Sequence, residues 1–136
     1  MRGKVVAVVI ALALSGPAVG QDSDAPAIQD VIQGQIEAFL KDDTATAFTF
    51  ASPMIQGLFG SPENFGRMVQ GGYPMIWKPS AVRYLGLRTE NGMTFQRVLV
   101  EDAGGATHLF DYEMIAMPEG WRINGVYPVK GNAAGA

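Results

Sequence analysis

The sequence predicts an α+β fold in which N-terminal helices pack on a curved antiparallel sheet of about four strands. Two observations carry this prediction. Up to about residue 72, apolar residues recur every three or four positions, which is the period of amphipathic helices. From about residue 82, four runs of alternating polarity are separated by short glycine-bearing turns, which is the pattern of antiparallel hairpins. The helical layer must then cover one face of the sheet.

The N-terminus predicts a secretory signal peptide over residues 1–20. Two cations, Arg2 and Lys4, precede an apolar run over residues 5–14, and small residues follow up to Gly20. The run is too short to cross a bilayer, which takes roughly 20 apolar residues. We therefore expect cleavage after Gly20 and a periplasmic or secreted product.

The exported chain should form a single domain over residues 21–130, followed by a disordered tail at 131–136. Of the 10 Lys and Arg residues, removal of Arg2 and Lys4 leaves 8, against 13 acids, so the net charge becomes −5. This acidic balance makes a nucleic-acid partner unexpected, since phosphate binding needs a clustered basic face. With no basic amphipathic helix, we also expect no membrane association after cleavage.

Composition restricts the chemistry as well. The chain has no cysteine, which excludes disulfides and thiolate nucleophiles, so stability must come from an apolar core. A single histidine excludes sites built from several histidines, and the sequence has no calcium loop of spaced Asp and Asn residues. We expect no metal and no cofactor.

The first helix is predicted over residues 27–43, AIQDVIQGQIEAFLKDD, which places its apolar residues on one stripe. Within it only Gly34 is unfavourable, by roughly 1 kcal/mol relative to alanine. The polar sequence Asp42-Asp43-Thr44 ends this helix and can cap a short second helix in TATAFTFA.

Two Ser-Pro pairs predict two further helices, because serine suits the N-cap and proline the first helical position. Ser52-Pro53 begins PMIQGLF, which Gly60 ends, and Ser61-Pro62 begins PENFGRMVQ, which Gly71-Gly72 ends. The next segment, at residues 71–79, is expected to be irregular because of its glycines and prolines.

Four runs then predict strands: VRYLGLR, MTFQRVLVED, THLFDYEMIAM and WRINGVYPV. Short turns containing glycine separate them at residues 90–92, 103–105 and 118–120. Consecutive strands joined in this way form antiparallel hairpins, and therefore a meander.

Three stretches of the sequence carry a family resemblance: AIQDVIQGQIEAFLKDD, FTFASPMIQGLFGSPENFGRMVQGGYPMIWKP and EGWRINGV. Residues 27–127 thereby resemble a family of small exported bacterial proteins known as a domain of unknown function. That family looks similar to the nuclear-transport-factor and ketosteroid-isomerase-like superfamily, which implies a cystatin-like cone fold. The resemblance implies no activity and carries over no catalytic residue, since function on this fold depends on the individual pocket.

His108 is the first candidate site residue. On an alternating strand, His108 and Tyr112 share a face that should cover the core, whereas Asp111 points to the other face. A His-Asp dyad within this strand is therefore disfavoured. A rim histidine bonded to backbone or water is the simpler interpretation, and catalysis would need a carboxylate from a helix, such as Glu37 or one of Asp42 and Asp43.

Three more residues are candidates for ligand binding. Either Gln96 or Arg97 must interrupt the buried face of the second strand, and Arg97 could meet a ligand carbonyl or form a surface ion pair. Tyr73 and Trp77 lie in an apolar segment that either plugs the core or forms the mouth of a pocket.

These features support three hypotheses about function. The first is a non-catalytic exported domain that binds a small apolar or amphipathic molecule, or a protein partner, in a pocket between helices and sheet through Tyr73, Trp77, Arg97, His108 and Tyr112. The second is an isomerase-, dehydratase- or hydrolase-like enzyme using His108. The third is a subunit that forms a homodimer through its open sheet face.

Overall fold

The computed structural model describes residues 16–130, with side chains from Ser23 onward. The apolar run of the predicted signal peptide and the predicted tail at 131–136 lie outside the described residues. The elements are α1 (Gly16–Leu40), α2 (Thr44–Thr49), α3 (Pro53–Phe59), α4 (Pro62–Gly72), α5 (Pro74–Trp77), β1 (Ala81–Glu90), β2 (Met93–Glu101), β3 (Thr107–Met117) and β4 (Gly120–Pro128). Helices followed by strands confirm the predicted α+β class.

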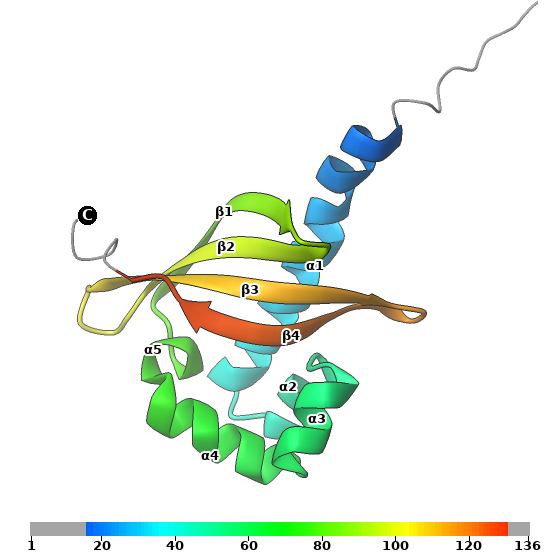
Figure 1. Ribbon diagram of the computed structural model, residues 1–136. Helices are drawn as coiled ribbons and strands as arrows, with labels where there is room; N and C mark the ends of the chain where they lie inside the picture. Colours follow the sequence, from blue (N-terminus) through cyan, green and yellow to red (C-terminus); the bar gives the residue numbers. More distant parts are fainter. Residues whose placement is uncertain (1–15, 131–136) are drawn as a thin grey trace, which may run out of the picture.

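The four strands form one antiparallel sheet in the order β1-β2-β3-β4, so the predicted meander is confirmed. The first hairpin turns at Asn91 and Gly92, which both have positive φ, as a two-residue turn between right-handed twisted strands requires. Figure 1 shows α1 passing behind the curved sheet and α2 to α5 gathered below the sheet.

Helix α1 begins earlier than the sequence predicts, at Gly16 instead of residue 27, and Pro26 lies inside it. It ends at Leu40, before the predicted end at 43, because Asp42 adopts a left-handed conformation with φ of 59°. The Asp43 N–H then donates to the Ala38 carbonyl at 2.8 Å and the Asp42 N–H to the Phe39 carbonyl at 2.9 Å, which is the Schellman pattern. Among the described residues, no helix has the length and apolar character to cross a membrane.

Lys78 ties the C-terminus of α1 to the segment after α5. Its Nζ donates to the carbonyls of Phe39 and Leu40 at 2.9 and 3.0 Å, and to Oδ1 of Asp42 at 2.8 Å. A cation here satisfies carbonyls that the helix leaves free and lies at the negative end of its dipole.

Gly34, the unfavourable residue of α1, has a packing role. A Cβ built on it would lie 2.7 Å from Cζ of Phe50. The glycine therefore allows the Phe50 ring to lie directly on the helix, which offsets its low helix propensity.

The predicted N-caps of α3 and α4 and the predicted glycine cap at the end of α3 are confirmed, whereas α4 includes Gly71 and Gly72 and has Tyr73 as its C-cap. The Ser52 and Ser61 hydroxyls accept hydrogen bonds from the N–H groups of Ile55 and Asn64, and Gly60 ends α3 in the left-handed conformation. The prediction of irregular structure at residues 71–79 is wrong in part, because α4 extends through Gly72 and Pro74 begins the one-turn helix α5. Proline is tolerated there, since a first-turn N–H has no partner within the helix.

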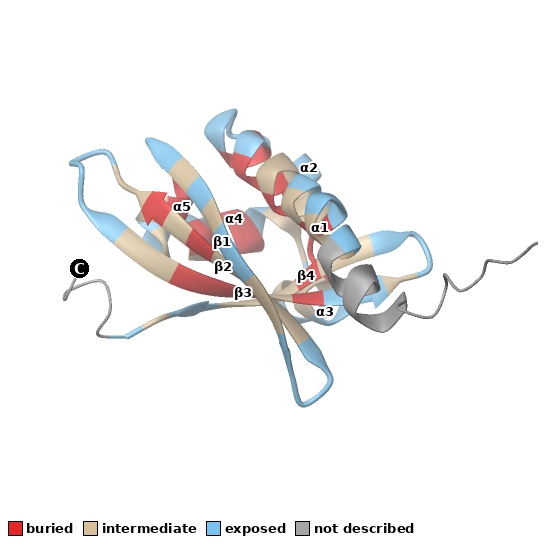
Figure 2. Ribbon diagram, turned by 90° about the horizontal axis from the view of Figure 1, so that it is seen from above, coloured by how far each residue is buried: buried red, intermediate tan, exposed pale blue. Residues whose placement is uncertain are grey.

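The core lies between α1, α4 and the inner face of the sheet, and Phe39 is at its centre. The Phe39 ring centroid lies 5.3 Å from that of Trp77 and 6.0 Å from that of Phe65. On the strands, Val98 and Phe110 are buried against the helices. Figure 2 shows buried residues along α1 and the middle strands, with exposed hairpin tips.

Two bulges shape the sheet. In β1 the register shifts between Tyr84 and Leu87, and the buried Gln96 amide compensates by donating to the Leu85 and Arg97 carbonyls, both at 2.9 Å. Of the two polar candidates in β2, Gln96 is therefore the one that faces the helices. In β4 the register shifts at Asn124, since Glu113 pairs with Gly125 and Met114 with Ile123.

Candidate binding site

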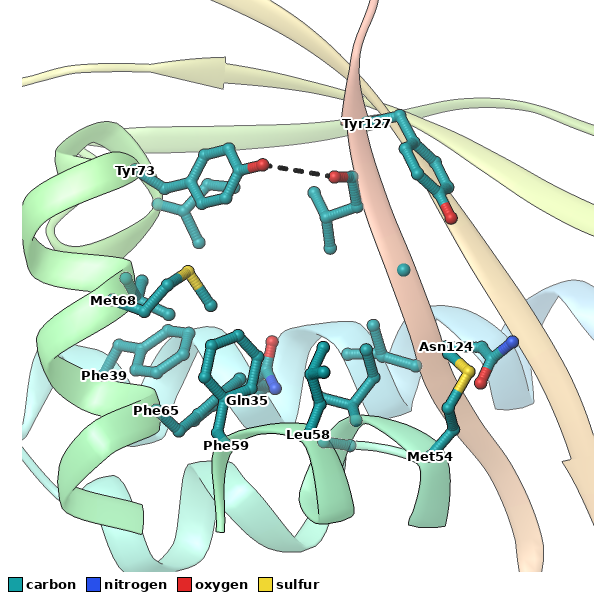
Figure 3. Close-up of a pocket in the computed structure, with 17 residues that line it drawn as sticks. Gln35, Phe39, Met54, Leu58, Phe59, Phe65, Met68, Tyr73, Asn124 and Tyr127 are labelled. Carbon is teal, nitrogen blue, oxygen red and sulfur yellow. Dashed lines mark hydrogen bonds between the residues drawn. The ribbon is translucent and has the colours of Figure 1, made fainter. Parts of the chain in front are cut away.

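A cavity of about 340 Å³ lies between α3, α4 and the edge strand β4 (Figure 3). Its volume is in the range of small-molecule sites, which are roughly 300–1,000 Å³. The cavity is open to solvent on one side. Its walls include Met54, Ile55, Leu58 and Phe59 from α3, Phe65, Met68 and Val69 from α4, and residues 123–127 of β4.

The wall is almost entirely apolar. Among the described residues that line it, the polar side chains are those of Gln35, Tyr73, Asn124 and Tyr127, and none is a Lys, Arg, His, Asp or Glu. A tyrosine is neutral near pH 7, so this wall offers apolar contact and a few neutral hydrogen-bonding groups.

Helix α3 forms the outer wall and has no buried residue. Met54 is 59% exposed and Leu58 70% exposed, although both are large and apolar. No charged residue occurs between Asp43 and Glu63. Apolar side chains left exposed beside an apolar cavity indicate a contact surface.

A chain of hydrogen bonds joins two residues that line the cavity, Asn124 and Tyr127, to Ser52 and Glu113, which do not line it. The Ser52 hydroxyl donates to Oδ1 of Asn124 at 2.6 Å, and the Asn124 amide donates to Oε2 of Glu113 at 3.0 Å. The Tyr127 hydroxyl donates to Oε1 of Glu113 at 3.0 Å. Partial burial, followed by the nearby Glu113 carboxylate, raises the pKa of Tyr127.

The structure brings one of the predicted site residues, Tyr73, to this cavity. Its hydroxyl donates a long hydrogen bond of 3.5 Å to the Val126 carbonyl, and its ring meets that of Phe110 edge-on at 6.0 Å. Trp77 is instead buried against Phe39 and borders a separate, more open depression of about 450 Å³ beside Asp102.

Arg97 lies on the opposite face of the sheet, where it forms an ion pair with Asp111. Its Nε and Nη2 donate to Oδ1 and Oδ2 of Asp111 at 2.9 and 3.0 Å, and Arg88 donates to the same oxygens at 3.2 and 3.1 Å. Burial alone would raise the pKa of Asp111, but the hydrogen bonds from Arg97 and Arg88 outweigh it and lower that pKa. Arg97 therefore forms an ion pair on the outer face, away from the cavity.

Replacing Asp111 with asparagine should lower the free energy of unfolding at neutral pH by about 1–3 kcal/mol, because two guanidinium groups lose their charged acceptor. A pKa lowered in the folded state means that the unfolded state binds more protons as the pH falls below the usual 3.8. The difference in the free energy of unfolding between the wild type and Asp111→Asn should therefore shrink as the pH falls through that range. Urea unfolding of both proteins at neutral pH and in steps below 3.8 measures this, and a difference that does not change with pH would contradict it.

The carboxylate that is hydrogen-bonded to His108 belongs to the same hairpin and not to a helix. Its Nε2 lies 2.8 Å from Oδ2 of Asp102, while Oδ1 of Asp102 accepts from the N–H groups of Gly104 and Ala106 at 2.9 and 3.0 Å. The hydrogen bond with His108, and then that from Ala106, lower the pKa of Asp102. The pair fastens the β2–β3 turn, and neither residue lines the cavity.

Tyr112 is fully buried on the inner face, and its hydroxyl has no hydrogen-bond partner among the described residues. Burial raises the pKa of this phenol. Because an unsatisfied buried hydroxyl is costly, Tyr112→Phe should raise the free energy of unfolding by about 1 kcal/mol. Urea unfolding measures this directly, and a clear loss of stability in the variant would show that the hydroxyl is satisfied.

Sequence reasoning missed the residues that form the cavity, namely those of α3 and of the β4 edge. The uncharged stretch between Asp43 and Glu63 was a usable signal, because surface helices normally carry charges. Asn124 had no such signal, since it lies at the β4 bulge, which the sequence pattern does not indicate. Within the part of the chain that the structure describes, no group of three or more His, Cys, Asp or Glu residues could hold a metal ion.

The sequence matches the family described as "Domain of unknown function (DUF4864)" over residues 21–136. The chain belongs to this family. No curated protein and no solved structure matches the chain. For this DUF4864 domain, the relation to the nuclear-transport-factor and ketosteroid-isomerase-like superfamily therefore stays a prediction.

Proposed function

We propose that the protein is an exported binding protein that holds a small apolar or amphipathic molecule in the cavity between α3, α4 and β4. The observation that carries this proposal is the wall itself, which is almost entirely apolar and has no Lys, Arg, His, Asp or Glu among its described residues. A pocket of this kind gains affinity by removing apolar surface from water and orients its ligand with a few polar groups.

The geometry gives less support to an enzyme. General acid–base catalysis needs a titratable group within hydrogen-bonding reach of the reacting atom. His108 has a carboxylate partner, but that partner, Asp102, also binds two backbone N–H groups of the hairpin, and neither residue borders the cavity. The pair is explained by its role in fastening the turn.

Export is the second part of the proposal. It is supported by the cations and the apolar run at the N-terminus, together with the small residues before residue 21. The family match begins at residue 21, directly after the predicted cleavage position.

Titration with a neutral apolar dye, N-phenyl-1-naphthylamine, tests the binding function. We expect saturable enhancement of its fluorescence at one site and an increase in the melting temperature that grows with dye concentration. A ligand at 100 times its Kd stabilises the folded state by about 2.7 kcal/mol. Fluorescence that rises linearly without saturation, with an unchanged melting temperature, would refute the proposal.

A further inference from the structure

The α1 side of the cavity carries a buried polar side chain, Gln35. This residue is 3% exposed and lines the cavity together with Phe39 of the same helix. Its Nε2 donates to the Ala47 carbonyl at 3.1 Å. This hydrogen bond fixes the orientation of the amide, because a carbonyl oxygen only accepts and the opposite orientation would place two oxygens against each other. The amide oxygen, Oε1, is therefore the end that is left for another partner.

Oε1 of Gln35 is open to the cavity. Among the described residues, no N–H or O–H group donates to it. Within the same part of the chain, the Tyr112 hydroxyl is the one side-chain polar atom that is fully buried without a partner, so Oε1 of Gln35 is not sealed inside the protein. Figure 3 shows the Gln35 amide near the rings of Phe39 and Phe59, with its oxygen toward the middle of the cavity.

The other polar side chains of the wall already have partners. Figure 3 shows the Tyr127 ring and the Asn124 side chain on the side of β4 away from the cavity, and both donate hydrogen bonds to Glu113. The Tyr73 hydroxyl donates to a carbonyl of β4. Oε1 of Gln35 is therefore the polar end on this wall that makes no hydrogen bond within the described part of the chain.

This oxygen restricts the chemistry of a ligand. A ligand that fills the cavity excludes water from Oε1, so it must supply a hydrogen-bond donor or leave a buried acceptor unsatisfied. A hydroxyl group supplies the donor without a charge. A carboxylate would bring a second acceptor to a wall that has no described cation, and an ammonium group would lose its hydration without finding a carboxylate there.

We propose that the cavity selects neutral apolar alcohols, with the hydroxyl group donating to Oε1 of Gln35 and the apolar part lying between α3 and α4. This inference rests on the proposed binding function and specifies the chemistry of its ligand. The hydrogen bond from Nε2 to Ala47 holds the acceptor in place before the ligand arrives, which lowers the entropic cost of binding.

Three probes with the same eight-carbon chain test the inference: 1-octanol, octyl methyl ether and octanoate. Each is used at neutral pH to displace N-phenyl-1-naphthylamine from the protein. We expect octanol to bind about tenfold more tightly than the ether, although the ether is more apolar, because an ether oxygen cannot donate a hydrogen bond. Octanoate should bind at least about tenfold more weakly than octanol.

Gln35→Leu removes the acceptor and replaces it with an apolar side chain of similar size. Octanol and the ether should then bind within about threefold of each other. Gln56→Leu is the matched control. The Gln56 amide also donates to backbone carbonyls, those of Phe48 and Ala51 at 2.9 and 3.1 Å, but Gln56 does not line the cavity. This variant loses similar structural hydrogen bonds and should keep the wild-type preference for octanol.

The wild-type comparison needs no variant. If the dye binds but octanol displaces it no better than the ether or octanoate does, the inference is overturned and the binding function stands. A preference for octanol that persists in Gln35→Leu as it does in Gln56→Leu would overturn the inference as well, because the hydroxyl group would then be recognised elsewhere. If the dye itself does not bind, the binding function fails, and the inference fails with it.

Discussion

Replacing Phe39 with alanine is expected to lower the free energy of unfolding by about 3–5 kcal/mol, the usual cost of removing a buried phenylalanine. Phe39 is 1% exposed and packs against both Trp77 and Phe65. It therefore joins α1, α4 and α5 through one ring. Since small domains are stable by only about 5–15 kcal/mol, this single change should remove a large part of the stability. Urea unfolding followed by tryptophan fluorescence measures the effect.

Phe95→Ala is the matched control for this experiment. Phe95 lies on the outer face of β2, half-buried under the Arg88 guanidinium, whose Cζ is 4.9 Å from the ring centroid. Its removal should cost about 1 kcal/mol, the value of a partly exposed cation–π contact. Equal losses in the two variants would mean that the aromatic cluster around Phe39 is not the main source of stability.

Replacing Met68 with tryptophan should lower the affinity for N-phenyl-1-naphthylamine by at least about tenfold. Figure 3 shows the Met68 side chain extending from α4 into the cavity. An indole at this position would occupy space that the ligand needs. Because the space is open in the free protein, we expect the free energy of unfolding to change by less than about 1.5 kcal/mol. Dye titration together with urea unfolding separates the two effects.

Met93→Trp provides the same substitution outside the cavity. Met93 is 42% exposed at the start of β2 and is not among the residues that line the cavity. The Met93→Trp variant should bind the dye as the wild type does. If Met68→Trp also binds the dye with unchanged affinity, the dye occupies another site and the cavity is not the binding site.

The parts of the fold that local sequence determines were predictable. Ser52-Pro53 and Ser61-Pro62 begin helices because their own side chain and ring satisfy the first turn, whatever surrounds them. Asn91-Gly92 makes a hairpin turn for a similarly local reason, namely that both residues tolerate positive φ. Such signals act within a few residues and give the elements and their order.

Long-range contacts account for the errors. The end of α1 depends on Asp42 adopting positive φ and on Lys78, which comes from 36 residues further along the chain. A glycine suits position 34 inside this helix because the Phe50 ring packs directly against it. The hydrophobic periodicity of the sequence carries no information about these contacts. The boundaries of the first helix were therefore predicted less well than its existence.

The candidate site was predictable only in its general chemistry. The aromatic inner face of the sheet was anticipated correctly, with Phe110, Tyr112 and Met114 all buried. The position of the cavity depends on α3 remaining at the surface and on the bulge at Asn124, and both are consequences of tertiary packing. The pattern PMIQGLF predicts a helix but does not indicate that this helix buries none of its residues.

Native mass spectrometry of the exported chain, purified from its own host, shows whether the cavity holds a ligand. We expect a wild-type mass that exceeds that of the polypeptide by one small molecule, which is released on denaturation. We also expect that Met68→Trp, produced in the same way, carries no such molecule, whereas Met93→Trp does. A bare polypeptide mass for the wild type, identical in ligand content to Met68→Trp, would contradict a binding function for this cavity.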